Sequence, residues 1–99
     1  MIIEYSTVGG LRLLEPNGFH KFKVVLRAPL ATSRPMIDGV SFIDDSNALV
    51  AINVVPRLPG VPDNAEWRAG YDKMVAAARN HGWIDETGNA IRAHVEWVD

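Results

Sequence analysis

The apolar residues between positions 64 and 81 recur at intervals of three and four, which is the period of an α-helix with one buried side. This apolar side consists of Trp67, Tyr71, Met74, Val75 and Ala78. Asp63, with Glu66 three residues later, predicts a capping box at the start of the helix. Gly82 can adopt the left-handed conformation that ends a helix. We therefore expect one amphipathic helix over residues 64–81.

Strict alternation of apolar and polar residues begins at Ala90 and predicts a half-buried strand. Its apolar positions are Ile91, Ala93, Val95 and Trp97. The preceding segment, residues 85–89, has the composition of a hairpin turn with Gly88 in the left-handed position of a bulge. We expect the apolar face of this strand to pack beneath Trp67 and Tyr71 of the helix.

Short apolar-rich runs in the first 28 residues predict three strands. They cover residues 2–7, 11–14 and 19–28, with a Gly9-Gly10 turn after the first and a proline-containing turn at residues 15–18 after the second. In the third run the even positions are mostly apolar and the odd positions mostly basic. This strand should therefore have a core face and a basic face.

Two further β-rich runs, residues 37–43 and 48–55, are joined by a turn made of Asp, Ser and Asn. The second run is apolar at odd and even positions alike, and only Asn53 interrupts it. This pattern is typical of a strand that is buried on both faces. The proline-rich segment 56–62 then forms a stiff connection to the helix.

The order of these elements predicts an α+β fold with the sequence β-β-β-β-β-α-β. Hairpin connections predominate and no β-α-β rhythm is present, so we expect a curled, mainly antiparallel sheet of five to six strands with the helix packed on one face. A chain of 99 residues, 47% of them hydrophobic, suits a single domain over residues 1–99.

Composition sets limits on the compartment and on the partners. The chain has no cysteine, so disulfides and thiolate chemistry are excluded. The first residues lack the features of a signal peptide and no apolar run reaches transmembrane length, so we expect a cytoplasmic protein without membrane contact. The formal charge of −2 gives no overall field that would attract nucleic acid.

A row of titratable residues on the last strand is the best candidate for catalysis. Arg92, His94 and Glu96 share one face, and Glu96 could orient His94 as a general base. Neither a nucleophile nor a pocket can be placed beside His94 from the sequence. Ion pairs between this strand and Lys21 or Lys23 are the more common arrangement on such a face. The sequence therefore favours a protein that is not an enzyme.

A basic row on the third strand is the only local positive patch. It consists of Lys21, Lys23 and Arg27, and Arg92 could extend it. Nucleic-acid binding would also need exposed aromatic rings for stacking, and none is expected on this face. We therefore regard a solvated strand face as the default and nucleic-acid binding as the alternative.

The histidines and tryptophans are assigned structural roles by the same patterns. His20, His81 and His94 fall on different elements and show no ligand spacing, so neither a metal site nor a cofactor is expected. The three tryptophans, Trp67, Trp83 and Trp97, each occupy a position that their element should bury. We expect all three to pack in the core.

The width of the predicted sheet suggests how the protein works. One helix covers two or three strands, so the doubly apolar strand at residues 48–55 needs a second cover, either the N-terminal hairpin or a partner subunit. The leading hypothesis is a small, non-catalytic binding or accessory module that acts through a sheet edge or face. It would form a homodimer and bind a protein or small molecule that the sequence does not identify. The alternatives are a nucleic-acid-binding protein that uses the Lys21, Lys23 and Arg27 face, and a small enzyme with His94 as general base.

Overall fold

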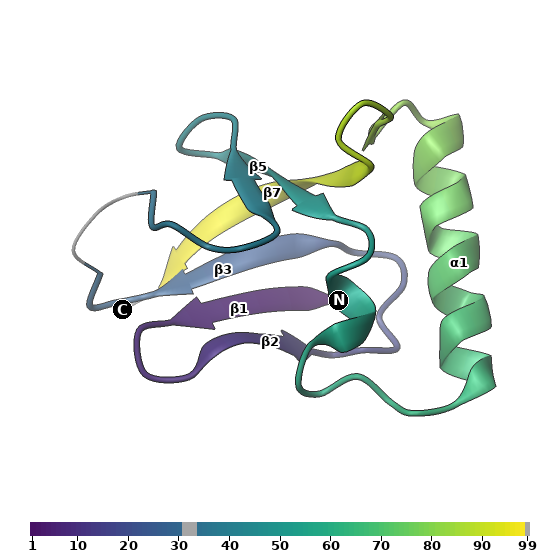
Figure 1. Ribbon diagram of the computed structural model, residues 1–99, viewed down its shortest axis with the longest axis horizontal. Coiled ribbons are helices and arrows are strands. Elements are labelled where there is room, and N and C mark those ends of the chain that lie inside the picture. Colours follow the sequence, from purple (N-terminus) through teal and green to yellow (C-terminus); the bar gives the residue numbers. More distant parts are fainter. Residues whose placement is uncertain (31–33, 99) are drawn as a thin grey trace.

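A curled seven-stranded sheet and one α-helix form the fold in the computed structural model, which describes residues 1–30 and 34–98 (Figure 1). The strands are β1 (Ile2–Ser6), β2 (Gly10–Leu14), β3 (Lys23–Arg27), β4 (Val40–Phe42), β5 (Asn47–Ala51), β6 (Ile84–Asp85) and β7 (Ala90–Val98). The helix α1 spans Ala65–Asn80, and a short 3-10 turn, η1, spans Val55–Arg57. The α+β class is confirmed, and β6 adds a short strand that the predicted order lacks.

The sheet is mixed, so the prediction of a mainly antiparallel sheet was wrong. Its strand order is β2-β1-β3-β7-β5-β4, with β6 beside the first residues of β7. The pairs β1–β3 and β3–β7 are parallel, and the other described pairs are antiparallel. Strand β2 returns the chain to the end of the sheet where β1 begins, so β3 must start there and run parallel to β1. Strand β7 then enters the middle of the sheet from the same end.

The N-terminal hairpin extends the sheet and does not fold over it. Strand β1 lies between β2 and β3, in register with both. Of the two covers that the sequence suggested for the second face of the sheet, the N-terminal hairpin is therefore wrong. The face opposite α1, which we call the outer face, carries polar side chains in place of a cover. Its charged and polar residues include Glu4, Arg12, Lys23, Arg27, Arg92, His94 and Glu96.

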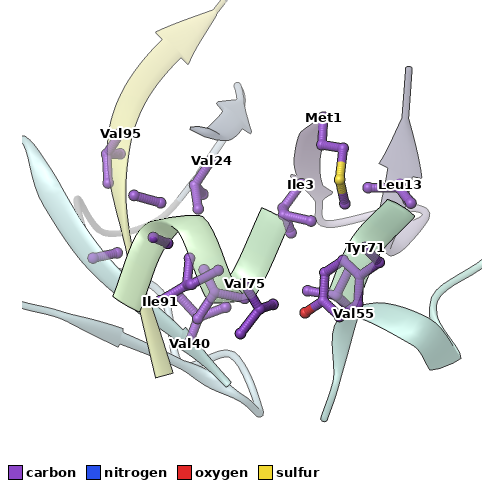
Figure 2. Close-up of a cluster of buried hydrophobic side chains, with 14 of the residues drawn as sticks. Met1, Ile3, Leu13, Val24, Val40, Val55, Tyr71, Val75, Ile91 and Val95 are labelled. Atoms are coloured by element: carbon purple, nitrogen blue, oxygen red, sulfur yellow. The ribbon is translucent and has the colours of Figure 1, made fainter. Parts of the chain in front are cut away.

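The core lies between α1 and the inner face of the sheet. Figure 2 shows Tyr71 and Val75 of α1 in one cluster with Ile3 and Val24 of neighbouring strands. The polar atom of Tyr71 is satisfied because its hydroxyl donates to the carbonyl of Ile52 at 2.8 Å. The predicted buried side of the helix is therefore correct at these positions, and burial of the apolar side chains is the main stabilising contribution.

The third and fifth strands are shorter than the sequence suggests. Strand β3 begins at Lys23, because residues 19–22 form turns that are held against β1. The amino group of Met1 donates to the carbonyls of Gly18 at 2.6 Å and Lys21 at 2.8 Å. Strand β5 ends at Ala51, and the chain then turns toward the helix through η1. Val55 is fully buried there, so it does not need the cover that a strand over 48–55 would require.

The helix begins one residue later than predicted. Asn64 is the N-cap, and its side-chain oxygen accepts from the N–H of Trp67 at 2.7 Å. The expected capping box at Asp63 is therefore wrong, although Glu66 does lie in the first turn. Aspartate and asparagine are comparable caps, so two adjacent candidates cannot be separated by propensity alone.

The helix ends as the sequence predicts, at Gly82. This residue has a φ of 78°. The N–H of Trp83 donates to the carbonyl of Ala78 at 2.9 Å, and the N–H of Gly82 donates to that of Arg79 at 3.1 Å. These two bonds form a Schellman motif, which satisfies carbonyls that the helix leaves open.

Replacement of Gly82 by alanine should lower the free energy of unfolding by about 1 kcal/mol, measured by urea denaturation. No atom lies within 4 Å of the position that a Cβ would take, so the cost is purely conformational. Gly88→Ala is the control at a glycine without a positive φ, where the added Cβ would meet only the end of the Asp85 side chain, 2.9 Å from its Oδ2. Asn89, with a φ of 50°, occupies the left-handed position that the sequence assigned to Gly88. An equal loss in the two variants would contradict this account of the helix end.

Candidate functional site

Two adjoining hollows lie where β7 exchanges one neighbour for another. Along the edge opposite β5, the first residues of β7 pair with β6, and those from His94 onward pair with β3. The hollows have volumes of about 300 and 320 Å³. Both are lined by His20, Phe22, Trp83 and Arg92. We call the two together the groove.

The groove runs from the end of α1 toward the outer face of the sheet. The hollow on the helix side is also lined by Phe19, Lys21, Met74, Ala77, Ala78, His81 and Ile91. The hollow on the sheet side adds Asn47, Ala93 and His94. Figure 1 shows the last turn of α1 close to the start of β7. An aromatic and partly apolar lining with a few convergent polar groups is typical of ligand sites.

Trp83 is held at the groove by its backbone. Its N–H is bonded to the helix at Ala78, and its carbonyl accepts from the N–H of Arg92 at 2.9 Å. Its side chain is 55% exposed, and its ring stacks on His81 with the ring centres 4.8 Å apart. The prediction that Trp83 packs in the core was therefore wrong. The left-handed turn at Gly82 redirects the chain immediately before Trp83, so neither helical nor strand periodicity extends to it.

The charged side chains that line the groove are cations. Lys21 and Arg92 are exposed on it, and none of the described residues lining either hollow is an Asp or Glu. Glu96 interacts with Lys21 and Asp44 with Arg92, and both carboxylates lie outside the lining, whereas Glu15 lines a separate hollow that also contains Lys21. The groove is therefore suited to an anionic group.

The candidate catalytic row of Arg92, His94 and Glu96 lies on the outer face, but the carboxylate of Glu96 bonds to a lysine of the neighbouring strand. Glu96 accepts a hydrogen bond from the Nζ of Lys23 at 2.9 Å. This bond is the main reason that the pKa of Glu96 lies below its ordinary value. The cross-strand ion pair that the sequence favoured is therefore present between β3 and β7. His94 lines the groove, and its role as a general base remains a prediction.

The predicted basic row is divided by the fold. Lys23 pairs with Glu96, and Arg27 lies about 13 Å further along β3, where it pairs with Glu4. Lys21 precedes the strand and lines the groove with Arg92. The structure therefore brings Lys21 and Arg92 together and places Arg27 elsewhere. Exposed aromatic surface, which the sequence analysis did not expect beside these cations, is supplied by Trp83.

The three histidines lie along the same groove. His20 and His81 line the helix-side hollow, and His20 and His94 line the sheet-side hollow. Among the residues that the structure describes, no group of three or more His, Cys, Asp or Glu residues is arranged to hold a metal ion. The histidines therefore form part of the lining of the groove.

A buried carboxylate on the outer face was not anticipated from the sequence. Glu4 is 2% exposed, and its two oxygens accept from the Nε atoms of Arg12 and Arg27. The hydrogen bond from Arg27 is the largest cause of a lowered Glu4 pKa, and burial acts in the opposite direction. The hairpin register, with Glu4 opposite Arg12, could have indicated the first pair. The second depends on the parallel contact between β1 and β3.

Comparisons with protein-family models, with curated proteins and with solved structures find no match. Among the described residues, no helix has both the length and the apolar character that crossing a bilayer requires. The functional argument therefore depends on the geometry of the groove.

Proposed function

We propose that the protein is a small binding module that takes an anionic ligand in the groove. The observation that carries the proposal is the exposed indole of Trp83 in the same hollow as Lys21 and Arg92, in a lining without carboxylates among the described residues. Opposite charge on the ligand would be attracted to these cations and oriented by them. The rigid backbone on both sides of Trp83 supports a preformed site, which lowers the entropic cost of binding.

Binding without bond chemistry is supported by the partners of the titratable groups. The carboxylate of Glu96 bonds to Lys23, and the carboxylate of Glu4 is enclosed by two arginines. Both carboxylates are engaged in ion pairs that lower their pKa. These pairs stabilise the outer face, whereas the groove offers an aromatic ring and cations to a ligand.

The test follows the three tryptophan indole N–H signals by NMR during titration with anions. The probes are an oligoglutamate, a heparin oligosaccharide and a single-stranded oligonucleotide. We expect at least one probe to shift the Trp83 signal and to leave Trp67 unchanged, because the indole of Trp67 is buried and donates to the carbonyl of Pro16 at 2.8 Å. Arg92→Gln should weaken the effect. If no anion shifts Trp83, or if Trp97 responds equally, the proposal is wrong.

Self-association is a separate part of the proposal, and it uses the β4 edge of the sheet. Strand β4 pairs with β5 on one side, and its flanking residues include Met36, which is 98% exposed, and the exposed Ile43. An open edge beside apolar side chains is a template for strand pairing between copies.

Sedimentation equilibrium at micromolar concentration should therefore give the mass of a homodimer. Ile43→Lys should shift the distribution toward the monomer, because a lysine at a strand edge opposes pairing. Ile43 does not line the groove, but its N–H donates to the carbonyl of Asn47, which does, so an unchanged Trp83 signal must accompany the shift toward the monomer. A monomeric mass for the unmodified chain would contradict the dimer and leave the groove proposal standing.

A further inference from the structure

We infer that the groove binds single-stranded nucleic acid, with a base stacked on Trp83 and neighbouring phosphates bound by Lys21 and Arg92. This inference rests on the proposed function and names the ligand class of the same site. It differs from the alternative raised by the sequence, because Lys23 and Arg27 are paired with carboxylates and the ligand would meet an exposed aromatic ring.

The exposed indole is the first argument. Trp83 is 55% exposed although the Schellman motif and the bond to Arg92 fix its backbone. It lines both hollows, so an incoming planar group can reach it from the groove. Tryptophan is a good stacking platform because every base presents a π-face, and the contact tolerates any sequence. His81 stacks on one side of the ring, so a base would stack on the surface that stays exposed.

The distribution of charge is the second argument. On the outer face, Lys23 pairs with Glu96, and Arg12 and Arg27 share Glu4, so these three cations are engaged in ion pairs. No ion pair within the described residues is recorded for Lys21 or Arg92. Glu96 and Asp44 act on these two cations only from outside the lining. Positive charge next to an aromatic ring matches the alternation of phosphate and base along a single strand.

The shape of the groove is the third argument. The two hollows share Phe22, Trp83 and Arg92 and continue from the end of α1 to the outer face beside His94. A flexible strand could follow this path with Trp83 between successive nucleotides. A duplex keeps its base faces covered and could contact only the cations. An acidic peptide could also pair with Lys21 and Arg92, but it would bring no planar group to the exposed part of the indole, whose ring already stacks on His81.

The experiment measures fluorescence anisotropy of labelled oligouridylate and oligothymidylate of about ten nucleotides, at low and rising salt. Trp83→Ala should weaken binding by about 5- to 150-fold. Trp97→Ala is the matched control, because Trp97 is 46% exposed and lies at the far end of β7 (Figure 1). It should bind like the unmodified protein. Arg92→Gln should weaken binding and reduce the slope of log affinity against log salt by about 0.7.

The outcomes separate this inference from the broader proposal. In one outcome, oligoglutamate or heparin shifts the Trp83 signal, and Trp83→Ala binds the oligonucleotides as tightly as the unmodified protein does. The site would then bind anions without stacking, and the inference would be wrong. Duplex binding as tight as single-strand binding would also overturn it. If no anionic probe affects the groove, both ideas fail.

Folding of each variant is checked by circular dichroism. If Trp83→Ala does not fold, Trp83→Leu replaces it, because leucine retains apolar bulk and removes the aromatic face. A lower affinity of folded Trp83→Leu for the oligonucleotides, with the affinity of Trp97→Ala unchanged, supports stacking. An unchanged affinity of Trp83→Leu overturns the inference. Preference for the uridylate over an oligodeoxyuridylate of the same length, which differs from it only at the 2′-hydroxyl, would identify RNA as the ligand.

Discussion

Trp67→Ala is expected to lower the free energy of unfolding by about 3–5 kcal/mol, the range for removal of a buried aromatic side chain. Trp67 is 4% exposed, and its ring stacks on Tyr71 with the ring centres 5.2 Å apart. Its indole N–H also donates to the carbonyl of Pro16 at 2.8 Å, which ties the helix to the turn after β2. The substitution removes apolar burial, ring packing and this hydrogen bond together. Urea unfolding followed by circular dichroism measures the loss.

Trp97→Ala is the control for that prediction and corrects the sequence analysis, which placed Trp97 in the core. The side chain is 46% exposed, because the end of β7 extends beyond the region that α1 covers (Figure 1). Partial burial should limit the loss to about 1.5 kcal/mol or less. Similar losses in the two variants would show that Trp67 does not have the structural role assigned to it.

Glu4→Gln is expected to lower the free energy of unfolding by about 1.5–3 kcal/mol near neutral pH. The change removes the negative charge enclosed by Arg12 and Arg27 and places an amide N–H₂ group against one of the two guanidinium groups. Both arginines are partly exposed, so water can solvate them and the loss should remain below that for a fully buried pair. Urea denaturation of the two proteins gives the difference.

The effect of Glu4 should also depend on pH. The pKa of this carboxyl is lower in the folded protein than its ordinary value of 4.5, so the unfolded chain takes up the proton first as the pH falls. The stability from Glu4 is thus fully present above that ordinary value and is lost as the pH falls toward the folded pKa. The difference between the unmodified protein and Glu4→Gln should therefore shrink in acid. A Glu4→Gln difference that is constant with pH would contradict the ion-pair account.

The groove results from a local irregularity of the sheet. Strand β6 pairs with only the first two residues of β7, and β3 begins to pair at His94. Between these points β7 meets the backbone of Trp83 through a single hydrogen bond from Arg92. The side chains of Trp83 and of the turn before β3 therefore surround an opening that a continuous ladder would have closed. This explains why the candidate site contains residues from four separate parts of the chain.

Local patterns in the sequence determined the elements whose causes are local. The 3.6-residue period predicted the buried side of α1, and Tyr71 and Val75 lie in the core as expected. Alternation predicted the inner face of β7 up to Val95, and the steric freedom of glycine predicted the helix end at Gly82. Each depends on residues within a few positions of one another, so neighbouring side chains and backbone sterics suffice.

The tertiary structure decided every feature that depends on distant segments. The parallel pairing of β1 and β3 brings Arg27 to Glu4, a contact that no local pattern contains, and the pairing of β3 and β7 selects Lys23 as the partner of Glu96 where the sequence left Lys21 and Lys23 open. The exposure of Trp83 depends on how α1 meets β7. Periodicity specifies which side of an element is apolar, but it does not specify which other element covers that side or where the cover ends. Burial, ion pairing and the groove all depend on that cover, so only the tertiary structure determines them.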